Sequence, residues 1–155
     1  MKKYEDLDVV EFDKNKIRET YPKNLHVIRK TKKIDSERAK YVPEGRFIRS
    51  TKSGLKNNIF PDKSLHMGNI DFQRYHRLPR DRVSWTVMPN WYDIRHKIHY
   101  KKNRPYSIRE CAELQTFSDD FEFKSKNIIK IYQMIGNAVP PLLGKKIAEE
   151  INEVY

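Results

Sequence analysis

Residues 132–141 read YQMIGNAVPP, and this short stretch decides how the C-terminal third of the chain is arranged. It separates two segments in which apolar residues recur at helical spacing. Gly136 suits the C-terminal cap of the first helix, because glycine adopts the left-handed conformation found there at little cost. Pro140 and Pro141 suit the start of the second helix, where a missing N–H breaks no hydrogen bond. The stretch therefore predicts a helix, a turn and a final helix.

The predicted final helix is amphipathic. Its apolar residues recur at spacings of four, four and three and form one stripe, which consists of Leu143, Ile147, Ile151 and Val154. Lysine and glutamate pairs lie on the other side of the helix. A short chain with few apolar residues must bury this stripe either against its own core or against another protein. The sequence leaves both possibilities open.

A second helix signal lies upstream, in residues 104–117, which read RPYSIRECAELQTF. Ser107 followed by Glu110 forms a capping box, in which each side chain satisfies a backbone N–H of the first turn. One helical face carries Ile108, Cys111, Ala112 and Gln115. The turn-forming sequence SDDF predicts that this helix ends near Phe117. Residues 125–134, SKNIIKIYQM, predict the helix that precedes the turn.

The first two thirds of the chain give shorter signals. The segments LDVVEF (7–12) and LHVIRKT (25–31) resemble short strands, and DSERAKYVPEG (35–45) resembles a helical turn ended by proline and glycine. Residues 46–70 are polar and dotted with glycine, which favours a loop. RVSWTVMPNW (82–91) is the best strand candidate, because apolar and polar residues alternate in it. We therefore expect an α+β fold, with an irregular, mostly β region at 1–103 and a helical segment at 104–155.

Charge separates the same two regions. The chain of 155 residues carries a net charge of +11. Residues 1–103 hold 25 of its 32 basic residues and 13 of its 21 acidic ones, whereas residues 104–155 are close to neutral. A basic region favours polyanions, because it neutralises phosphates and releases counterions. The alternative is a solvated basic surface with no specific ligand.

Composition limits the cellular setting. No stretch approaches the roughly 18 uninterrupted apolar residues that a membrane span requires, and the first residues, MKKYEDLDVVEF, do not resemble a signal peptide. The single cysteine, Cys111, cannot form an internal disulfide, which fits a reducing cytosol. We expect a cytoplasmic protein with no membrane partner.

The last third resembles the C-terminal end of the cytosine-5 DNA methyltransferase family. Residues 104–123, RPYSIRECAELQTFSDDFEF, resemble the family's penultimate block, R-x-L-T-x-R-E-x-A-R-L-Q-x-F-P-D-D-F. The matching residues are Arg104, Arg109, Glu110, Ala112, Leu114, Gln115, Phe117, Asp119, Asp120 and Phe121. The departures are Tyr106, Ser107, Glu113 and Ser118. YQMIGNAVPPLLGKKIAEEI (132–151) resembles the final block, in which an aromatic residue and glutamine precede G-N-[AS]-V. The two blocks occur in the family's order.

A third and weaker match lies in residues 74–87, RYHRLPRDRVSWTV, which resemble R-R-L-x-x-D-x-P-S-x-T-I. Arg77, Leu78, Asp81, Ser84 and Thr86 match, and Val83 replaces the family's proline. The resemblance implies that Thr86 contacts the phosphate beside a flipped base. The preceding arginines, which are Arg74, Arg77, Arg80 and Arg82, are candidates for phosphate or guanine contacts. The alternatives are an ordinary surface threonine and a solvated basic cluster.

The final block implies a cofactor. In the family this turn lies beside S-adenosyl-L-methionine, so the resemblance assigns cofactor contacts to Asn137, Ala138 and Val139. The alternative is a purely structural turn. Glu110 and Arg109 match the family strongly, but we interpret both as structural. Glu110 closes the helix cap, and Arg109 is expected to pair with a carboxylate that ties this helix to the basic region.

The residues that would carry out the family's reaction are absent from this sequence. It contains no Pro-Cys pair for the nucleophile, no Glu-Asn-Val block and no Phe-x-Gly-x-Gly loop for the cofactor. We predict that Cys111 is a buried core residue, because free cysteine is often buried. His96 and His99 lack the second pair of ligands that a zinc site requires. We therefore expect no catalytic residue and no metal ligand in this chain.

These observations favour the smaller, target-recognition subunit of a two-chain cytosine-5 DNA methyltransferase of the restriction-modification type. Its expected partners are double-stranded DNA and a catalytic subunit that carries the missing blocks, and the two subunits would share S-adenosyl-L-methionine. The C-terminal helices would then complete the partner's Rossmann-like α/β domain. Three alternatives remain: a non-catalytic DNA-binding protein, a truncated methyltransferase remnant, and a basic RNA-binding protein.

Overall fold

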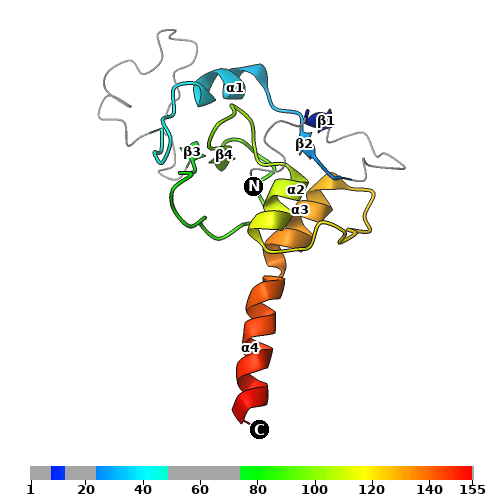
Figure 1. Cartoon of the computed structure of the whole chain (residues 1–155). Coiled ribbons are helices and arrows are strands. Elements are labelled where there is room, and N and C mark those ends of the chain that lie inside the picture. The colour runs from blue at the N-terminus through cyan, green and yellow to red at the C-terminus, as the bar shows by residue number, and fades with distance from the viewer. Residues whose placement is uncertain (1–7, 13–23, 49–73, 155) are drawn as a thin grey trace.

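The computed structural model describes residues 8–12, 24–48 and 74–154. Short strands and helices follow one another in the order β1, β2, α1, β3, β4, α2, α3, α4. Figure 1 shows that all of these except α4 gather into one body. The expected mixture of helices and small sheets is therefore confirmed. From residue 49 onwards, the loop predicted at 46–70 lies outside the described residues.

The first sheet is formed by two strands that the sequence predicted. Strand β1 (Val10–Phe12) pairs in parallel with β2 (Val27–Arg29), with Val10 opposite Val27. Phe12 and Val27 are buried, which anchors this small sheet in the core. The predicted helical turn is also confirmed, because α1 (Lys33–Ala39) follows β2 and ends before Pro43.

A second pair of strands, β3 (His76–Arg77) and β4 (Lys97–Ile98), is also parallel. It packs over a second cluster of buried apolar residues, which consists of Ala39, Val42, Ile48, Tyr75, Ile94 and Ile98. Figure 1 places β3 and β4 beneath α1. This part of the chain has little regular structure, as the sequence predicted.

The strand predicted at residues 82–91 is wrong. Residues 83–88 are extended, but they pair with no strand among the described residues. Val83 is 90% exposed and Trp85 is 48% exposed, whereas Val87 is buried. The alternating pattern therefore does not separate a buried face from an exposed one, which is the property that predicts a strand.

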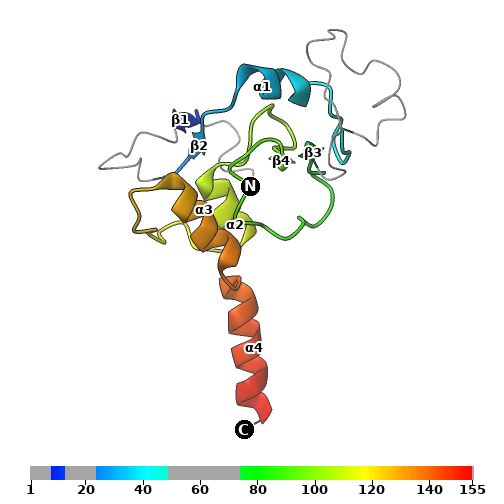
Figure 2. The same cartoon turned by 180° about the vertical axis from the view of Figure 1, so that it is seen from behind.

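Three helices form the C-terminal part: α2 (Ile108–Leu114), α3 (Ile128–Asn137) and α4 (Pro141–Val154). The predicted capping box is confirmed. The Glu110 backbone N–H donates to Ser107 Oγ over 3.2 Å, and the Ser107 N–H donates to Glu110 Oε2 over 2.7 Å. Helices α2 and α3 pack against each other, as both Figure 1 and Figure 2 show.

The predicted glycine cap of α3 is wrong. The helix continues through Gly136 to Asn137, and its C-cap is Ala138 in an extended conformation, with φ −79° and ψ 149°. No left-handed residue is needed here, because Val139 precedes Pro140 and a residue before proline favours extended backbone. The chain therefore leaves α3 in an extended conformation and enters α4 at Pro141.

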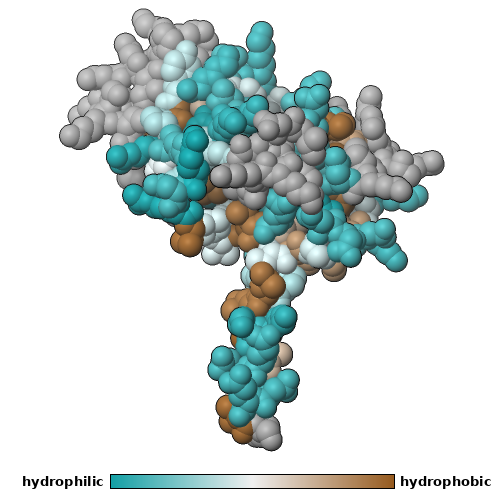
Figure 3. Space-filling view, in the orientation of Figure 1, coloured by the Kyte–Doolittle hydropathy of each residue, from teal (hydrophilic) through white to brown (hydrophobic). Residues whose placement is uncertain are grey.

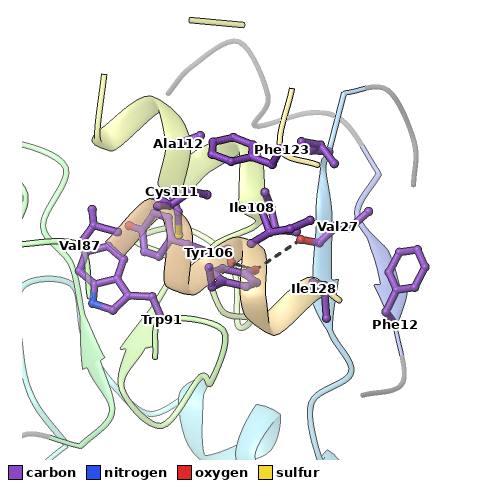
Figure 4. Packing of buried hydrophobic residues seen from close by; sticks show 14 of the residues in the cluster. Phe12, Val27, Val87, Trp91, Tyr106, Ile108, Cys111, Ala112, Phe123 and Ile128 are labelled. Carbon is purple, nitrogen blue, oxygen red and sulfur yellow. Dashed lines mark hydrogen bonds between the residues drawn. The ribbon is translucent and has the colours of Figure 1, made fainter. Parts of the chain in front are cut away.

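The main core contains residues from both the basic region 1–103 and the nearly neutral region 104–155. Its buried residues are Phe12, Leu25, Val27, Leu78, Val87, Trp91, Tyr106, Ile108, Cys111, Ala112, Phe123, Ile128, Ile131, Tyr132 and Ile135. Figure 4 shows residues from β1, β2, α2 and α3 packed together around Tyr106 and Ile108. Both sides of residue 103 contribute to this cluster. The division into regions 1–103 and 104–155 by function stays a prediction.

Helix α4 stands away from the body in both views (Figures 1 and 2). None of its residues is buried by the described chain. The predicted stripe of Leu143, Ile147, Ile151 and Val154 is between 50% and 78% exposed. Figure 3 shows apolar side chains on the visible face of α4, both near the body and near its tip. Among the described residues, no helix has the length and apolar character needed to cross a membrane.

Candidate functional site

An open groove of about 600 Å³ lies where three segments meet. One wall is the extended segment 83–87, the floor is the end of α2 at residues 113–115, and the other wall is formed by Gly136, Ala138 and Pro140. The groove brings Thr86, the candidate phosphate contact, to the same site as Ala138, a candidate cofactor contact. These residues are far apart in the sequence, so only the fold places them together.

The extended segment is held against α3 by a close approach at Gly136. A Cβ added to this glycine would lie 2.7 Å from the Met88 carbonyl carbon and equally close to Pro89 Cδ. Any side chain would therefore push the two segments apart. The buried side chain of Val87 and the hydrogen bond from the Trp91 N–H to the Met88 carbonyl (3.1 Å) fix the segment further. Gly136 thus sets the distance between the two walls of the groove.

The turn after α3 is fixed from the floor of the groove. The Gln115 side-chain amide donates to the carbonyl oxygens of Ile135 (2.9 Å) and Ala138 (3.4 Å). The Leu142 N–H donates to Thr116 Oγ1 over 3.1 Å. Helical spacing predicted that Gln115 lies on one face of α2, but it did not indicate this role. Its match to the family block was the one signal that could have indicated it.

The candidate cofactor residues lie in this turn. Asn137 is the last residue of α3 and is exposed, and Val139 is 66% exposed. Ala138 is half-buried, and its N–H donates a hydrogen bond to the Ile135 carbonyl oxygen. Asn137 therefore presents a side-chain amide, and Val139 an apolar side chain, beside the groove.

A cluster of aromatic rings and one lysine supports the wall formed by residues 83–87. The Lys97 ammonium group lies 4.3 Å from the centre of the Trp85 ring and 3.2 Å from His76 Nδ1. The His76 ring stacks on Phe47, with centroids 4.1 Å apart, and contacts Trp85 at 4.6 Å. Burial lowers the pKa of Lys97 to about 8. Burial, and then the charge of Lys97, lower the pKa of His76 to about 4, so this histidine is neutral at pH 7.

The four candidate arginines have different surroundings. Arg74 and Arg82 are exposed. Arg80 is also exposed, but its guanidinium group makes a bidentate ion pair with Glu44 at 2.9–3.1 Å. This pairing lowers the pKa of the Glu44 carboxyl group. Thr86 is exposed and lines the groove.

Arg77 is buried. It donates five hydrogen bonds of 2.6–3.0 Å, to the carbonyl oxygens of Val42, His99, Lys102 and Ala39 and to Asn103 Oδ1. Its guanidinium group joins the segment after α1 to the loop after β4. The described contacts therefore use its donors within the chain, and Arg77 is buried whereas the other three arginines are exposed.

The predicted structural role of Glu110 is confirmed. This carboxylate is 1% exposed and accepts two hydrogen bonds of 2.7 Å from the Arg104 guanidinium group. His99 Nδ1 accepts the backbone N–H groups of residues 101 and 102, so its Nε2 carries the proton and faces Glu110 Oε1 at 3.4 Å. These donors hold the pKa of Glu110 far below its usual value, although burial opposes them.

The predicted partner of Arg109 is wrong in kind. Among the described residues, its guanidinium group donates to the carbonyl oxygens of Asn24, Ser118 and Phe121, at 3.1–3.5 Å, and to no carboxylate. It still ties α2 to the segment before β2, as expected. Arg109 is 1% exposed, so the N–H groups of its guanidinium group need acceptors inside the protein. Backbone carbonyls suit this position because carbonyl oxygens from separate segments can each accept from a different N–H group.

Cys111 is buried in the main core, and burial raises the pKa of its thiol well above the usual value. A thiol in this state is a poor nucleophile. His99 Nε2 faces the Glu110 carboxylate, and His96 Nδ1 lies 3.3 Å from the Asn90 side-chain amide. Over the described ranges, no group of three His, Cys, Asp or Glu side chains could hold a metal ion.

Comparisons with known proteins agree with the resemblance in the C-terminal blocks. The pattern of the C-5 cytosine-specific DNA methylase family matches residues 2–153. The chain is 42% identical over 100 residues to the type II methyltransferase M1.HphI of Haemophilus parahaemolyticus, which covers 64% of this chain and 26% of that protein. It is 35% identical over 112 residues to M.PspPI of a Psychrobacter species, which covers 72% of this chain and 26% of that protein.

A third relative is the DNA (cytosine-5-)-methyltransferase M.ApeKI of Aeropyrum pernix. It is 42% identical over 81 residues, which cover 52% of this chain and 17% of that protein. The chain thus spans about a quarter of the length of the curated relatives it matches. The catalytic activity of the complete relatives is therefore not carried over with the similarity.

Proposed function

This chain belongs to the C-5 cytosine-specific DNA methylase family, and on that premise we propose that it is the target-recognition subunit of a two-chain cytosine-5 DNA methyltransferase of the restriction-modification type. The observation that carries the proposal is the groove between the extended segment 83–87 and the turn after α3. It brings Thr86, the candidate DNA contact, together with Ala138, the one candidate cofactor residue that lines the groove, and the other two, Asn137 and Val139, flank Ala138 in the chain. Such an enzyme acts on chromosomal or phage DNA in the cytoplasm.

The DNA-facing side of the proposal rests on Thr86 and the exposed arginines. The Thr86 hydroxyl can donate to a phosphate, and the exposed Arg74, Arg80 and Arg82, which precede Thr86 in the chain, add positive charge. Phosphate contacts of this kind fix the register of the protein on the duplex. Because the acceptors of Arg77 lie within the chain, we assign to Arg77 the positioning of this segment in place of a DNA contact.

The residues of the turn fit one edge of a pocket for S-adenosyl-L-methionine. Asn137 offers an exposed amide for the polar end of such a molecule, and Val139 offers an exposed apolar side chain. The cofactor would supply the methyl group. Gln115 would hold the turn in place from below through its bonds to Ile135 and Ala138. The rest of the pocket would come from the catalytic chain.

Helix α4 supports the proposal of a partner. Its stripe of Leu143, Ile147, Ile151 and Val154 is exposed, and apolar helix faces of this kind are normally covered. The helix carries acidic and basic residues on its other side, so it is unsuited to binding DNA along its length. We propose that the stripe packs against the α/β domain of the chain that carries the Pro-Cys, Glu-Asn-Val and glycine-rich blocks. Extrusion of the target base would then expose the cytosine to that domain.

Co-expression tests this function. The chain would be produced with the product of a neighbouring reading frame that carries the three missing blocks, and transfer of labelled methyl groups to double-stranded DNA would be measured. We expect that the pair copurifies and methylates DNA, and that this chain alone binds DNA without methylating it. A pair that copurifies without activity, or methylation by this chain alone, would contradict the proposal. DNA binding with no complementing partner would instead favour a non-catalytic DNA-binding protein.

A further inference from the structure

Trp85 is an exposed aromatic residue at an unusual position. It lies next to Thr86 on the extended segment that forms one wall of the groove, and it is 48% exposed. Large aromatic side chains normally bury most of their surface in a core or an interface. The described chain covers only about half of Trp85, and the exposed part of the residue faces the groove.

The ring is held firmly from its other side. The Lys97 ammonium group lies over it at 4.3 Å, and the His76 and Phe47 rings contact it with centroids at 4.6 Å and 5.4 Å. His76 and Lys97 belong to β3 and β4, so the support is part of the folded body. The orientation of Trp85 is therefore fixed before any ligand arrives, which lowers the entropic cost of binding.

The surroundings of Trp85 combine two kinds of chemistry. Val83 on the same segment is 90% exposed and offers further apolar surface. Thr86 offers a hydroxyl group, and the exposed Arg80 and Arg82 lie a few residues upstream. A nucleotide has the same composition, because a flat apolar base is joined to a charged phosphate. Arg80 already pairs with Glu44, but an apolar protein surface, which would match Trp85 and Val83, would offer no partner to the Arg82 guanidinium group or the Thr86 hydroxyl group.

We propose that Trp85 is a stacking surface for one unpaired base of the bound DNA, with Thr86 holding a phosphate of the same strand. The inference rests on the proposed DNA-recognition function and assigns the contact with the base to Trp85. Stacking on an aromatic side chain needs one open face of the base, and a base that is paired and stacked within the duplex does not offer one. An enzyme that acts on an extruded base creates such an unpaired position. Lys97 would act as a positioning residue, since it touches Trp85 and not the DNA.

Fluorescence gives a direct test, because the chain has two tryptophans and the other one, Trp91, is fully buried. The full chain would be titrated with a duplex that carries one unpaired cytosine opposite an abasic site, and with the fully paired duplex of the same sequence. We expect the first duplex to quench the Trp85 emission and the second to quench it less. In the Trp85→Phe variant, this quenching should disappear while the Trp91 emission remains.

Affinity measurements complete the test. Trp85→Ala should weaken binding to the duplex with the unpaired cytosine by about 10- to 100-fold, which is the usual value of one stacked base. Met88→Ala removes exposed apolar surface from the same segment at a residue that does not line the groove, and it should change affinity by less than about twofold. Circular dichroism would confirm that each variant is folded.

Three results would overturn the inference, and they can be told apart. Equal affinities of the wild type and Trp85→Ala, with no quenching by either duplex, would exclude stacking while leaving the DNA-recognition function intact. Quenching on addition of the catalytic chain without DNA would show that Trp85 faces protein. Failure of the wild type to bind any DNA would contradict the proposed function itself, and the inference with it.

Discussion

Gly136 of α3 and Pro89 of the extended segment lie so close together that the glycine has no room for a side chain. A Cβ at position 136 would meet the Pro89 ring and, at 2.7 Å, the Met88 carbonyl carbon. Because these neighbours include backbone atoms, they cannot move away as the end of a flexible side chain could. This contact joins the wall that carries Thr86 to the turn that carries Asn137.

Gly136→Ala should therefore lower the free energy of unfolding by about 1–3 kcal/mol, as is usual for overpacking, although alanine is the better helix former. The matched control is Gly144→Ala in α4, where an added Cβ has no neighbour within 4 Å. That variant should be at least as stable as the wild type and slightly more helical. Denaturant unfolding and circular dichroism would measure both. Equal stabilities of the two variants would show that the close contact is unimportant.

Glu110→Gln should destabilise the protein by about 3 kcal/mol or more, because the Arg104 guanidinium group would lose the charge that compensates it in a largely buried site. The control is Glu149→Gln, which removes an exposed carboxylate that pairs with Lys145 and Lys146. Surface ion pairs contribute about 0–1 kcal/mol, so the control should change stability little. A small loss of stability in both variants would mean that the buried pair of Glu110 and Arg104 contributes no more than a surface ion pair.

His76 should make the fold sensitive to acid. Its pKa is about 4 in the folded chain and 6.5 when unperturbed, so the unfolded state binds more protons between these values. The contribution of neutral His76 to the free energy of unfolding is complete above pH 6.5 and is lost as the pH falls toward 4. Between pH 7 and pH 5 the loss should be about 2 kcal/mol. The test compares unfolding free energies of the wild type and His76→Gln over this range, and parallel curves would exclude this histidine as the cause.

Ile147→Glu should prevent assembly with the catalytic chain while leaving the folded body unchanged, because Ile147 is 50% exposed and touches no core. The matched control is Asn152→Glu, which places the same charge on the opposite face of α4. Copurification from co-expressing cells would measure assembly, and thermal unfolding would measure stability. Assembly that is lost equally in both variants would point to a general effect of negative charge, and assembly kept in both would remove the stripe from the interface.

Asn137→Ala should raise the concentration of S-adenosyl-L-methionine that the assembled enzyme requires, since the exposed amide is the candidate contact for the cofactor. DNA binding by the chain alone should stay nearly unchanged, because Thr86 lies on the opposite wall of the groove and the candidate arginines do not line it. The measurements are methyl transfer at varied cofactor concentration and DNA binding without the partner. If both properties fell together, Asn137 would be a structural residue of the turn.

Local sequence signals predicted the elements that depend on local contacts. The capping box of Ser107 and Glu110 and the apolar spacing of residues 125–134 correctly gave α2 and α3, because both operate within a few residues. The alternation at residues 82–91 misled, since no neighbouring strand of the described chain pairs with this segment. Gly136 was assigned to a cap, whereas its true constraint comes from Met88 and Pro89, which the local sequence cannot place beside it.

The site shows the same limit. The family resemblance indicated Thr86 and the turn at 137–139 separately, and folding brought them to one groove. The match to the family stretch set Arg77 apart from the other three arginines, but it did not show that carbonyl oxygens from distant segments enclose the guanidinium group. The support of Trp85 by Lys97 and His76 likewise depends on the pairing of β3 with β4.

The isolation of α4 has a consequence for how the proposed enzyme would assemble. Helix α4 has 14 residues, none of which the described chain buries, and a helix of this length is only marginally stable in water by itself. Its helical form therefore gains most of its stability from the surface it meets. Part of the binding energy would then be spent on ordering the helix. Assembly would be weaker and more readily reversed than the apolar stripe alone suggests. The amount of active methyltransferase in a cell would therefore follow the concentrations of both chains.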